Sequence, residues 1–171
     1  MTPHTHQHQI ANRLSAVTQT VGFALWQLQE LEGASAQYFV LLAQAEKGMG
    51  LVAGAALIEK AQSKTFGATI HQIAKAGLLS PELETRFTNL LAERNWLVHS
   101  SRATSRSAVY NDTSLEAVIN RVTAISDESL VLLKQIGILV ERFVKQHGVT
   151  GKYIDEKANE LLEQWHASNV A

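Results

Sequence analysis

The chain has 171 residues, 15 of them basic and 16 acidic, and a formal net charge of -1. This length suits one domain with a sizeable core, and the balanced charge excludes a global attraction to nucleic acid or to an anionic membrane. The absence of cysteine excludes disulfides, thiolate metal sites and cysteine nucleophiles. Because the N-terminus resembles no signal peptide and the longest apolar run, LVAGAALI, is far shorter than the roughly 20 residues of a membrane span, we expect a cytoplasmic protein.

The composition favours an all-α fold, since helix-forming residues dominate, only two prolines occur and strand-like alternation is almost absent. An apolar face at 3.6-residue spacing, from Leu14 to Leu42, predicts a first long helix over about residues 10–47, ended by GMG at 48–50. We expect residues 1–9 to be a flexible tail, and the alternating histidines of HTHQH within it to bind no metal.

The rest of the chain predicts further helices, over about 51–62, 66–76, 81–100, 113–147 and 154–167. Ser80 and Pro81 are typical of a helix start, and Thr113 with Glu116 forms a capping-box pattern. The polar run SSRATSRSAVYND after His99 is typical of a loop. Together these elements predict a single helical bundle over 1–171, built on long antiparallel helices (10–47, 81–100 and 113–147) with shorter helices between them and at the C-terminus.

One stretch, LLAERNWLVHSSR at 90–102, places an arginine among leucines. On a helical wheel Arg94 lies at the centre of the apolar stripe, with six apolar side chains within about 60° of it, namely Leu83, Phe87, Leu90, Leu91, Leu97 and Val98. A guanidinium stays charged at any usable pH, and burying it without a partner is costly. Arg94 must therefore meet a carboxylate, a cleft or a bound anion.

Glu32 is a candidate partner because it interrupts the apolar stripe of the first helix, about 40° from Leu28 and in line with Phe39. Opposite charges that face inward on two helices of one bundle suggest an Arg94–Glu32 ion pair. Such a pair could be purely structural and fix the register of the two helices.

Two more polar residues flank Arg94 toward the end of its helix. Asn95 lies about 100° from it and His99 about 140°. A cation, an amide and an imidazole at one helix terminus form a set that can bind a phosphate and transfer a proton. The simpler alternative for a terminal histidine is a solvated or capping residue.

The segment RNWLVH, Arg94 to His99, resembles the signature of the HEPN superfamily: arginine, a polar residue, a few more residues and histidine. The preceding KTFGATIHQI also resembles the order seen in bacterial HEPN-like proteins. The resemblance implies an α-helical bundle, usually a homodimer with signature residues of both subunits facing a shared cleft. Many members are metal-independent endoribonucleases, often toxins or phage-defence proteins, and some pair with a nucleotidyltransferase antitoxin. Others are non-catalytic binding domains.

On this resemblance we expect an endoribonuclease that needs neither a metal nor a cofactor. His99 would act as general base or acid, Arg94 would stabilise charge on the phosphoryl oxygens, and Asn95 would position the phosphate or orient the histidine. Arg102 and Arg106 would bind the RNA backbone, unless they only solubilise a loop. Two alternatives remain: a non-catalytic module that binds a partner protein or nucleotide, and a helical bundle in which Arg94 is only structural.

Overall fold

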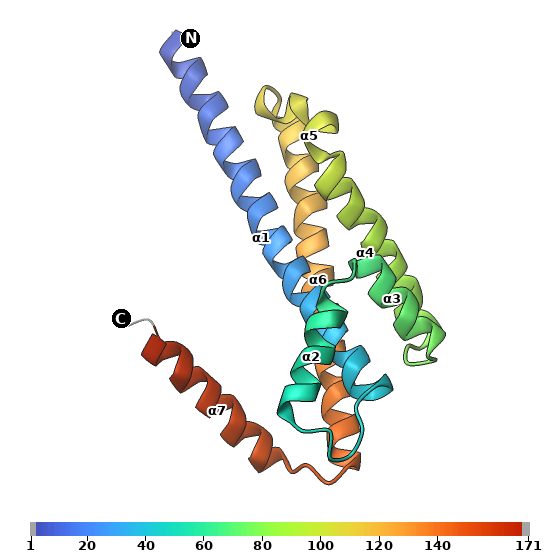
Figure 1. The fold of residues 1–171 in the computed structure, drawn as a ribbon. Coiled ribbons are helices and arrows are strands. Elements are labelled where there is room, and N and C mark those ends of the chain that lie inside the picture. The colour runs from blue at the N-terminus through green and yellow to red at the C-terminus, as the bar shows by residue number, and fades with distance from the viewer. Residues whose placement is uncertain (1–2, 169–171) are drawn as a thin grey trace. The chain divides into compact units, whose positions relative to one another are not determined.

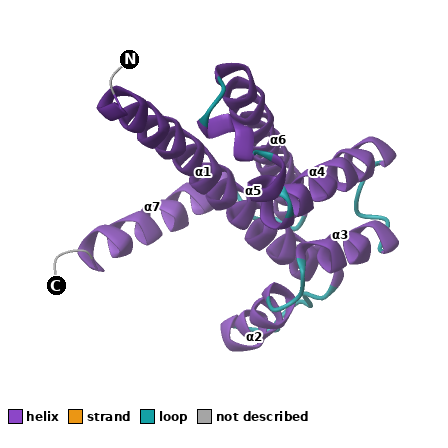
Figure 2. Cartoon of the chain, turned by 90° about the horizontal axis from the view of Figure 1, so that it is seen from above, coloured by secondary structure: helices purple, strands orange, loops and turns teal. Residues whose placement is uncertain are grey.

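The computed structural model describes residues 3–168, and all regular elements within them are helical (Figures 1 and 2), which confirms the all-α prediction. In chain order the elements are α1 (Pro3–Ala43), α2 (Leu51–Gln62), α3 (Phe66–Lys75), α4 (Pro81–His99), α5 (Ser101–Thr104), the 3-10 helix η1 (Arg106–Val109), α6 (Asp112–Gln146) and α7 (Gly151–Ser168). No helix in this described part of the chain is both long and apolar enough to cross a membrane.

The chain divides into two compact units, Met1–Ile136 and Gly137–Ala171, where the sequence predicted one domain. Unit 1 holds α1 to α5, η1 and most of α6, while unit 2 holds the end of α6 and α7. All residues of the predicted site belong to unit 1. In unit 2, α7 has exposed apolar side chains, namely Tyr153, Leu161, Leu162 and Trp165.

Within unit 1, α4 runs in the direction opposite to α1 and to α6 (Figure 1). α1 packs along α2, α3 and η1, and α3 packs on α4. The core consists of the inward apolar stripes of these helices, including Leu28, Leu31, Ile73, Phe87, Leu90, Leu97, Val122, Ile125 and Leu132, each at most 3% exposed. Seven of them, Leu28, Leu31, Phe87, Leu90, Leu97, Val122 and Ile125, are positions that the 3.6-residue periodicity of the sequence selects.

Local capping determines the ends of the short helices. The Ser80 hydroxyl accepts a hydrogen bond from the Leu83 amide at 3.3 Å, and Thr65 caps α3 in the same way through the Ala68 amide. Gly50, before α2, and Gly77, after α3, have positive φ angles of 77° and 68°, a conformation that glycine adopts readily. The predicted bounds 51–62 are therefore confirmed, and those of α3 and α4 agree within one residue.

The first helix is displaced toward the N-terminus relative to its prediction. It begins at Pro3, which suits a first helical position, so residues 3–9 are helical and not a flexible tail. Residues 1 and 2 lie outside the described part of the chain. The helix ends at Ala43, before the predicted Lys47, because the amides of Gln44 and Ala45 both donate to the Val40 carbonyl.

The segment after His99 is helical, and the prediction of a loop was wrong. Ser101–Thr104 forms α5, and Arg106–Val109 forms η1. The serine and threonine hydroxyls in α5 bond to carbonyls one turn back, and Ala108 in η1 is 1% exposed. The polar composition therefore did not indicate that this segment is helical and packs through the buried Ala108.

The cap of α6 is also one that the sequence did not predict. The Asn111 Oδ1 atom accepts from the Ser114 amide at 2.9 Å, so Asn111 caps the helix in place of Thr113.

Tyr38 joins α1 to the α3–α4 connection. Its side chain is 2% exposed, its hydroxyl donates to the Leu78 carbonyl at 2.7 Å, and burial raises its pKa. The hydroxyl therefore stays protonated in the folded state at pH values where an exposed tyrosine ionises.

We expect Tyr38→Phe to lower the free energy of unfolding by about 1 kcal/mol at pH 7, because the hydrogen bond to Leu78 is lost. As the pH rises through about 10, Tyr38 loses its proton first in the unfolded chain, which favours unfolding of the wild type. The phenylalanine variant has no such loss, so the difference should shrink at pH 11. Urea unfolding at both pH values measures this. Tyr110→Phe, at a 65% exposed side chain, is the control and should change the free energy by less than about 0.5 kcal/mol.

Candidate functional site

Arg94, on α4, forms the predicted ion pair with Glu32, on α1. The Arg94 Nε atom donates to the Glu32 Oε1 atom at 3.2 Å, and the two side chains are 28% and 29% exposed. Glu32, which interrupts the apolar stripe of α1, therefore neutralises Arg94 at the centre of the apolar stripe of α4. Both groups remain reachable from solvent, so the pair is not sealed in the core.

The guanidinium of Arg94 keeps most of its hydrogen-bonding capacity. It has five N–H groups, of which one is used by Glu32 and one is directed at the Asn95 Oδ1 atom, 3.5 Å from Nη1. The other three have no partner among residues 3–168. An anion that approaches from the solvent side can therefore bind Arg94 without breaking its ion pair with Glu32.

His99 is the last residue of α4, and its side chain is exposed. Its imidazole makes no hydrogen bond or ion pair within the described residues, and Asn95 is exposed as well. The structure thus places the three predicted residues along the last two turns of one helix, with a direct contact between Arg94 and Asn95 but none between Arg94 and His99.

The KTFG segment fixes α3 against the part of α4 that precedes Arg94. Phe66 packs edge-on against Phe87, with ring centroids 6.2 Å apart. A Cβ atom at Gly67 would lie 3.2 Å from the Leu91 Cδ2 atom, so a larger residue would force Leu91 to move. Lys64 donates to Gln72 at 3.0 Å and, with Gln62 and Glu32, lines a recess of about 260 Å³. The carboxylate that holds Arg94 therefore also faces this polar recess.

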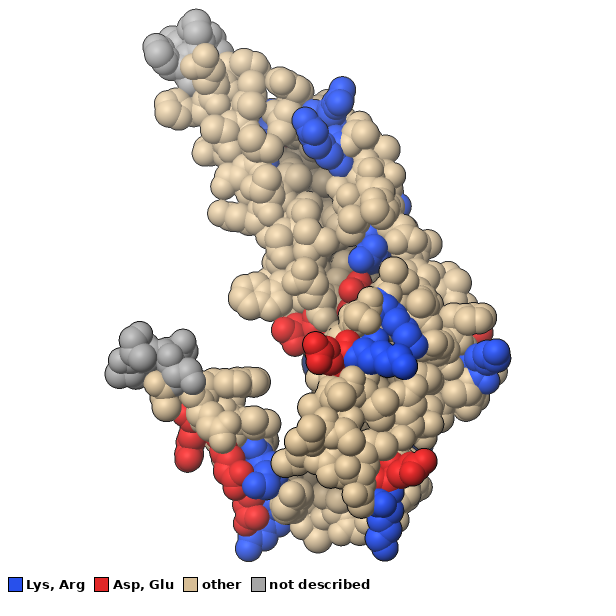
Figure 3. Space-filling view, in the orientation of Figure 1, with Lys and Arg blue, Asp and Glu red and all other residues tan. Residues whose placement is uncertain are grey.

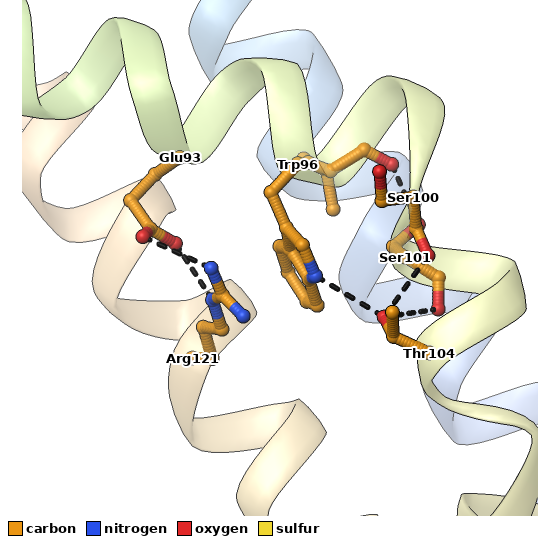
Figure 4. Close-up of polar contacts among 7 residues, drawn as sticks. Glu93, Trp96, Ser100, Ser101, Thr104 and Arg121 are labelled. Atoms are coloured by element: carbon orange, nitrogen blue, oxygen red, sulfur yellow. Dashed lines mark hydrogen bonds and ion pairs between the residues drawn. The ribbon is translucent and has the colours of Figure 1, made fainter.

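A second group of contacts holds the end of α4 against α5 and α6 (Figure 4). Arg121, on α6, donates two hydrogen bonds to Glu93 at 2.7 and 3.0 Å, and its guanidinium lies 3.6 Å from the centre of the Trp96 ring. The Trp96 Nε1 atom donates to the Thr104 hydroxyl at 3.1 Å. These contacts from both sides determine where the His99 end of the helix lies.

Sequence reasoning missed Arg121 and Glu93, although the sequence contains a signal for them. Arg86 and Glu93 are seven residues apart on α4, and Arg121 and Glu128 are seven apart on α6. Seven residues bring two side chains to nearly the same face of a helix. Two antiparallel helices can therefore pair these charges crosswise, as observed: Arg86 binds Glu128 at 2.7 and 2.8 Å. The hydrogen bond to Glu128 raises the pKa of Arg86.

Arg102 and Arg106 are exposed, and they come from α5 and η1. Neither side chain forms an ion pair within the described residues, and neither is bonded to Arg94, Asn95 or His99. Both line a separate cleft of about 740 Å³ between α1 and the segment from α5 to α6.

Comparison of the chain with protein-family models, with curated proteins and with solved structures gives no match. The HEPN resemblance therefore stays a prediction that depends on the signature and its helical setting. Among residues 3–168, no three side chains of the types His, Asp and Glu come together in a group that could hold a metal ion.

We expect the Arg94–Glu32 pair to contribute a coupling of about 1 kcal/mol in a double-mutant cycle of Arg94→Ala and Glu32→Ala. The value should exceed that of a fully exposed pair because both side chains are more than two-thirds buried. Urea unfolding of the four proteins measures it.

The control cycle combines Glu32→Ala with Arg121→Ala, two residues that share no partner, and its effects should add within about 0.5 kcal/mol. Strict additivity in the Arg94–Glu32 cycle would show that the pair does not stabilise the fold.

Proposed function

We propose that this protein is a metal-independent endoribonuclease of HEPN type that acts as a homodimer. The observation that supports the proposal best is the state of Arg94. Its guanidinium donates to Glu32 at 3.2 Å and lies 3.5 Å from the Asn95 Oδ1 atom, yet three of its N–H groups have no partner in the described chain. These three groups can bind an anion while the ion pair with Glu32 stays intact. An exposed imidazole and an exposed amide follow it within two turns.

The chemistry that fits these groups is an internal transfer at one RNA phosphate. The 2′-hydroxyl attacks the adjacent phosphorus, and an imidazole of His99 accepts its proton. The bond from phosphorus to the 5′-oxygen of the next nucleotide breaks, and a protonated imidazole gives that oxygen its proton. The products are a 2′,3′-cyclic phosphate and a free 5′-hydroxyl. Arg94 would stabilise the charge that develops on the non-bridging oxygens.

A dimer follows from the number of groups that this reaction needs. One chain supplies a single His99, on the same helix as Arg94, whereas the reaction uses one base and one acid. Two copies that meet along the His99 ends of α4 would supply both. The exposed positions of His99 and Asn95 leave this end of the helix accessible to a second copy.

In this proposal Arg102 and Arg106, which follow His99 in the sequence, bind the RNA. Both are exposed and unpaired within the described residues, so they can bind backbone phosphates without losing an internal contact. A role as a toxin or in phage defence, with an antitoxin or other partner protein, belongs to the same proposal.

We expect the purified protein to cleave single-stranded RNA in the presence of EDTA and to leave 2′,3′-cyclic phosphate ends. His99→Ala should lower the cleavage rate by about 100-fold or more, the usual contribution of a general acid or base. Because His99 is exposed and has no partner among residues 3–168, the free energy of unfolding of this variant should lie within about 0.5 kcal/mol of the wild-type value. Gel analysis of labelled RNA, with mass analysis of the ends, measures both the rate and the product.

His71→Ala is the matched control, since His71 is an exposed histidine on α3 that lies outside the proposed site, and it should retain full activity. A folded protein that binds RNA but cleaves none would contradict the nuclease proposal and favour the non-catalytic binding module. Loss of activity in His71→Ala as well would mean that His99 has no specific role.

A further inference from the structure

The cleft that Arg102 and Arg106 line has apolar walls. Leu14, Val17, Val21 and Leu25 form one wall, at helical spacing along α1, and Val109 and Val118 lie in the opposite wall. The cleft encloses about 740 Å³, which lies within the range of roughly 300–1,000 Å³ that is typical of small-molecule sites. The walls, unlike the recess beside Glu32, offer mainly apolar surface.

This apolar surface is incompletely covered by the fold of unit 1. Leu14, at one side of the cleft, is 51% exposed, and Tyr110, at another, is 65% exposed. Val17, Val21 and Leu25 are only partly buried, although they continue the same stripe of α1 that becomes core from Leu28 onward. Exposed apolar surface is unfavourable in water, so burial of an apolar ligand in the cleft is favourable.

The charges at the cleft all have one sign. Arg102 and Arg106 are its only charged lining residues within the described chain, and no carboxylate lines it. Neither arginine has an acidic partner among residues 3–168, whereas the nearby Arg13 is paired with Asp112 and bonded to the Val109 carbonyl. Figure 3 shows a group of Lys or Arg atoms near the upper end of unit 1 that has no Asp or Glu atoms beside it on that face.

We propose that this cleft binds a small amphipathic anion: a molecule with one alkyl tail and a carboxylate or phosphate headgroup. The tail lies between the α1 stripe and the wall formed by η1 and α6, and the headgroup binds the two guanidiniums. A nucleic-acid backbone uses the arginines but not the apolar walls, and an uncharged lipid uses the walls but not the arginines. The combination fits an amphiphile, and it does not depend on the nuclease proposal.

The probe is decanoate, kept below its micelle-forming concentration. Decanol and decyltrimethylammonium, which have the same alkyl tail and no negative charge, are the comparison ligands. Calorimetric titration of the full chain should show saturable binding of decanoate and at least tenfold weaker binding of the other two. Octanoate should bind about two- to fourfold more weakly per methylene removed, as expected for a tail that is buried.

Two variants separate the contributions of headgroup and tail. The double variant Arg102→Gln/Arg106→Gln should weaken decanoate at least tenfold and leave decanol unchanged, while Val21→Trp, which fills the cleft, should abolish both. Lys47→Gln/Lys60→Gln removes two exposed charges that do not line the cleft and should change nothing. Circular dichroism and thermal unfolding verify that each variant is folded.

Four results would overturn the proposal. One is the absence of saturable decanoate binding, and another is binding that the arginine variant leaves unchanged. A third is binding to vesicles of phosphatidylglycerol and phosphatidylcholine without binding of free decanoate, which would make the cleft a membrane contact. The fourth is dissociation of a dimer by Val21→Trp, measured by light scattering, which would make the cleft a subunit interface.

Discussion

The ion pair between Arg94 and Glu32 is the constraint on which the arrangement of α1 and α4 depends. Each charge interrupts an apolar stripe, so either one alone would be a largely buried charge without its partner. The pair favours the register in which it forms, and in that register Leu28 and Leu31 of α1 and Leu90 and Leu97 of α4 are all buried. A slide of one helical turn, about 5.4 Å, would separate the charges and leave both in apolar surroundings. The pair therefore specifies the register even where its net contribution to stability is small.

The charges on α4 and α6 act differently, because they lie at the edge of the core and not within its stripe. Arg86–Glu128 and Arg121–Glu93 are each bidentate, and they repeat at a seven-residue interval on both helices. Bidentate geometry fixes the relative rotation of two helices more tightly than a single bond does. Trp96 connects the Arg121–Glu93 pair to α5, because the Arg121 guanidinium lies over its ring and its indole N–H donates to Thr104. The helix end that carries His99 is thus held from two sides, although no side chain among residues 3–168 bonds to His99 itself.

The sequence predicted those features that depend on local chemistry or on a strong period. The bounds of α2, the Ser80 cap and the Arg94–Glu32 pair follow from turn residues and from the helical wheel, and all three are confirmed. The predictions failed where tertiary contacts decide. The polar segment after His99 is helical because Ala108 is buried against the bundle, and Arg121 gains its role from a helix that is distant in sequence. Periodicity also cannot show where a continuous helix passes from one compact unit to another, as α6 does at Ile136.

Arg102 and Arg106 belong both to the proposed RNA-binding surface and to the proposed cleft for an amphipathic anion. The segment that carries them leads directly from His99, so a phosphate chain bound at Arg94 could extend over it. The same two guanidiniums stand at an apolar cleft whose walls no RNA backbone would use. A guanidinium that binds the headgroup of an amphiphile cannot at the same time neutralise a backbone phosphate, so the two ligands must weaken each other's binding by the same factor. The position of α5, set by Trp96 and Thr104, would then determine how strongly the two sites are coupled.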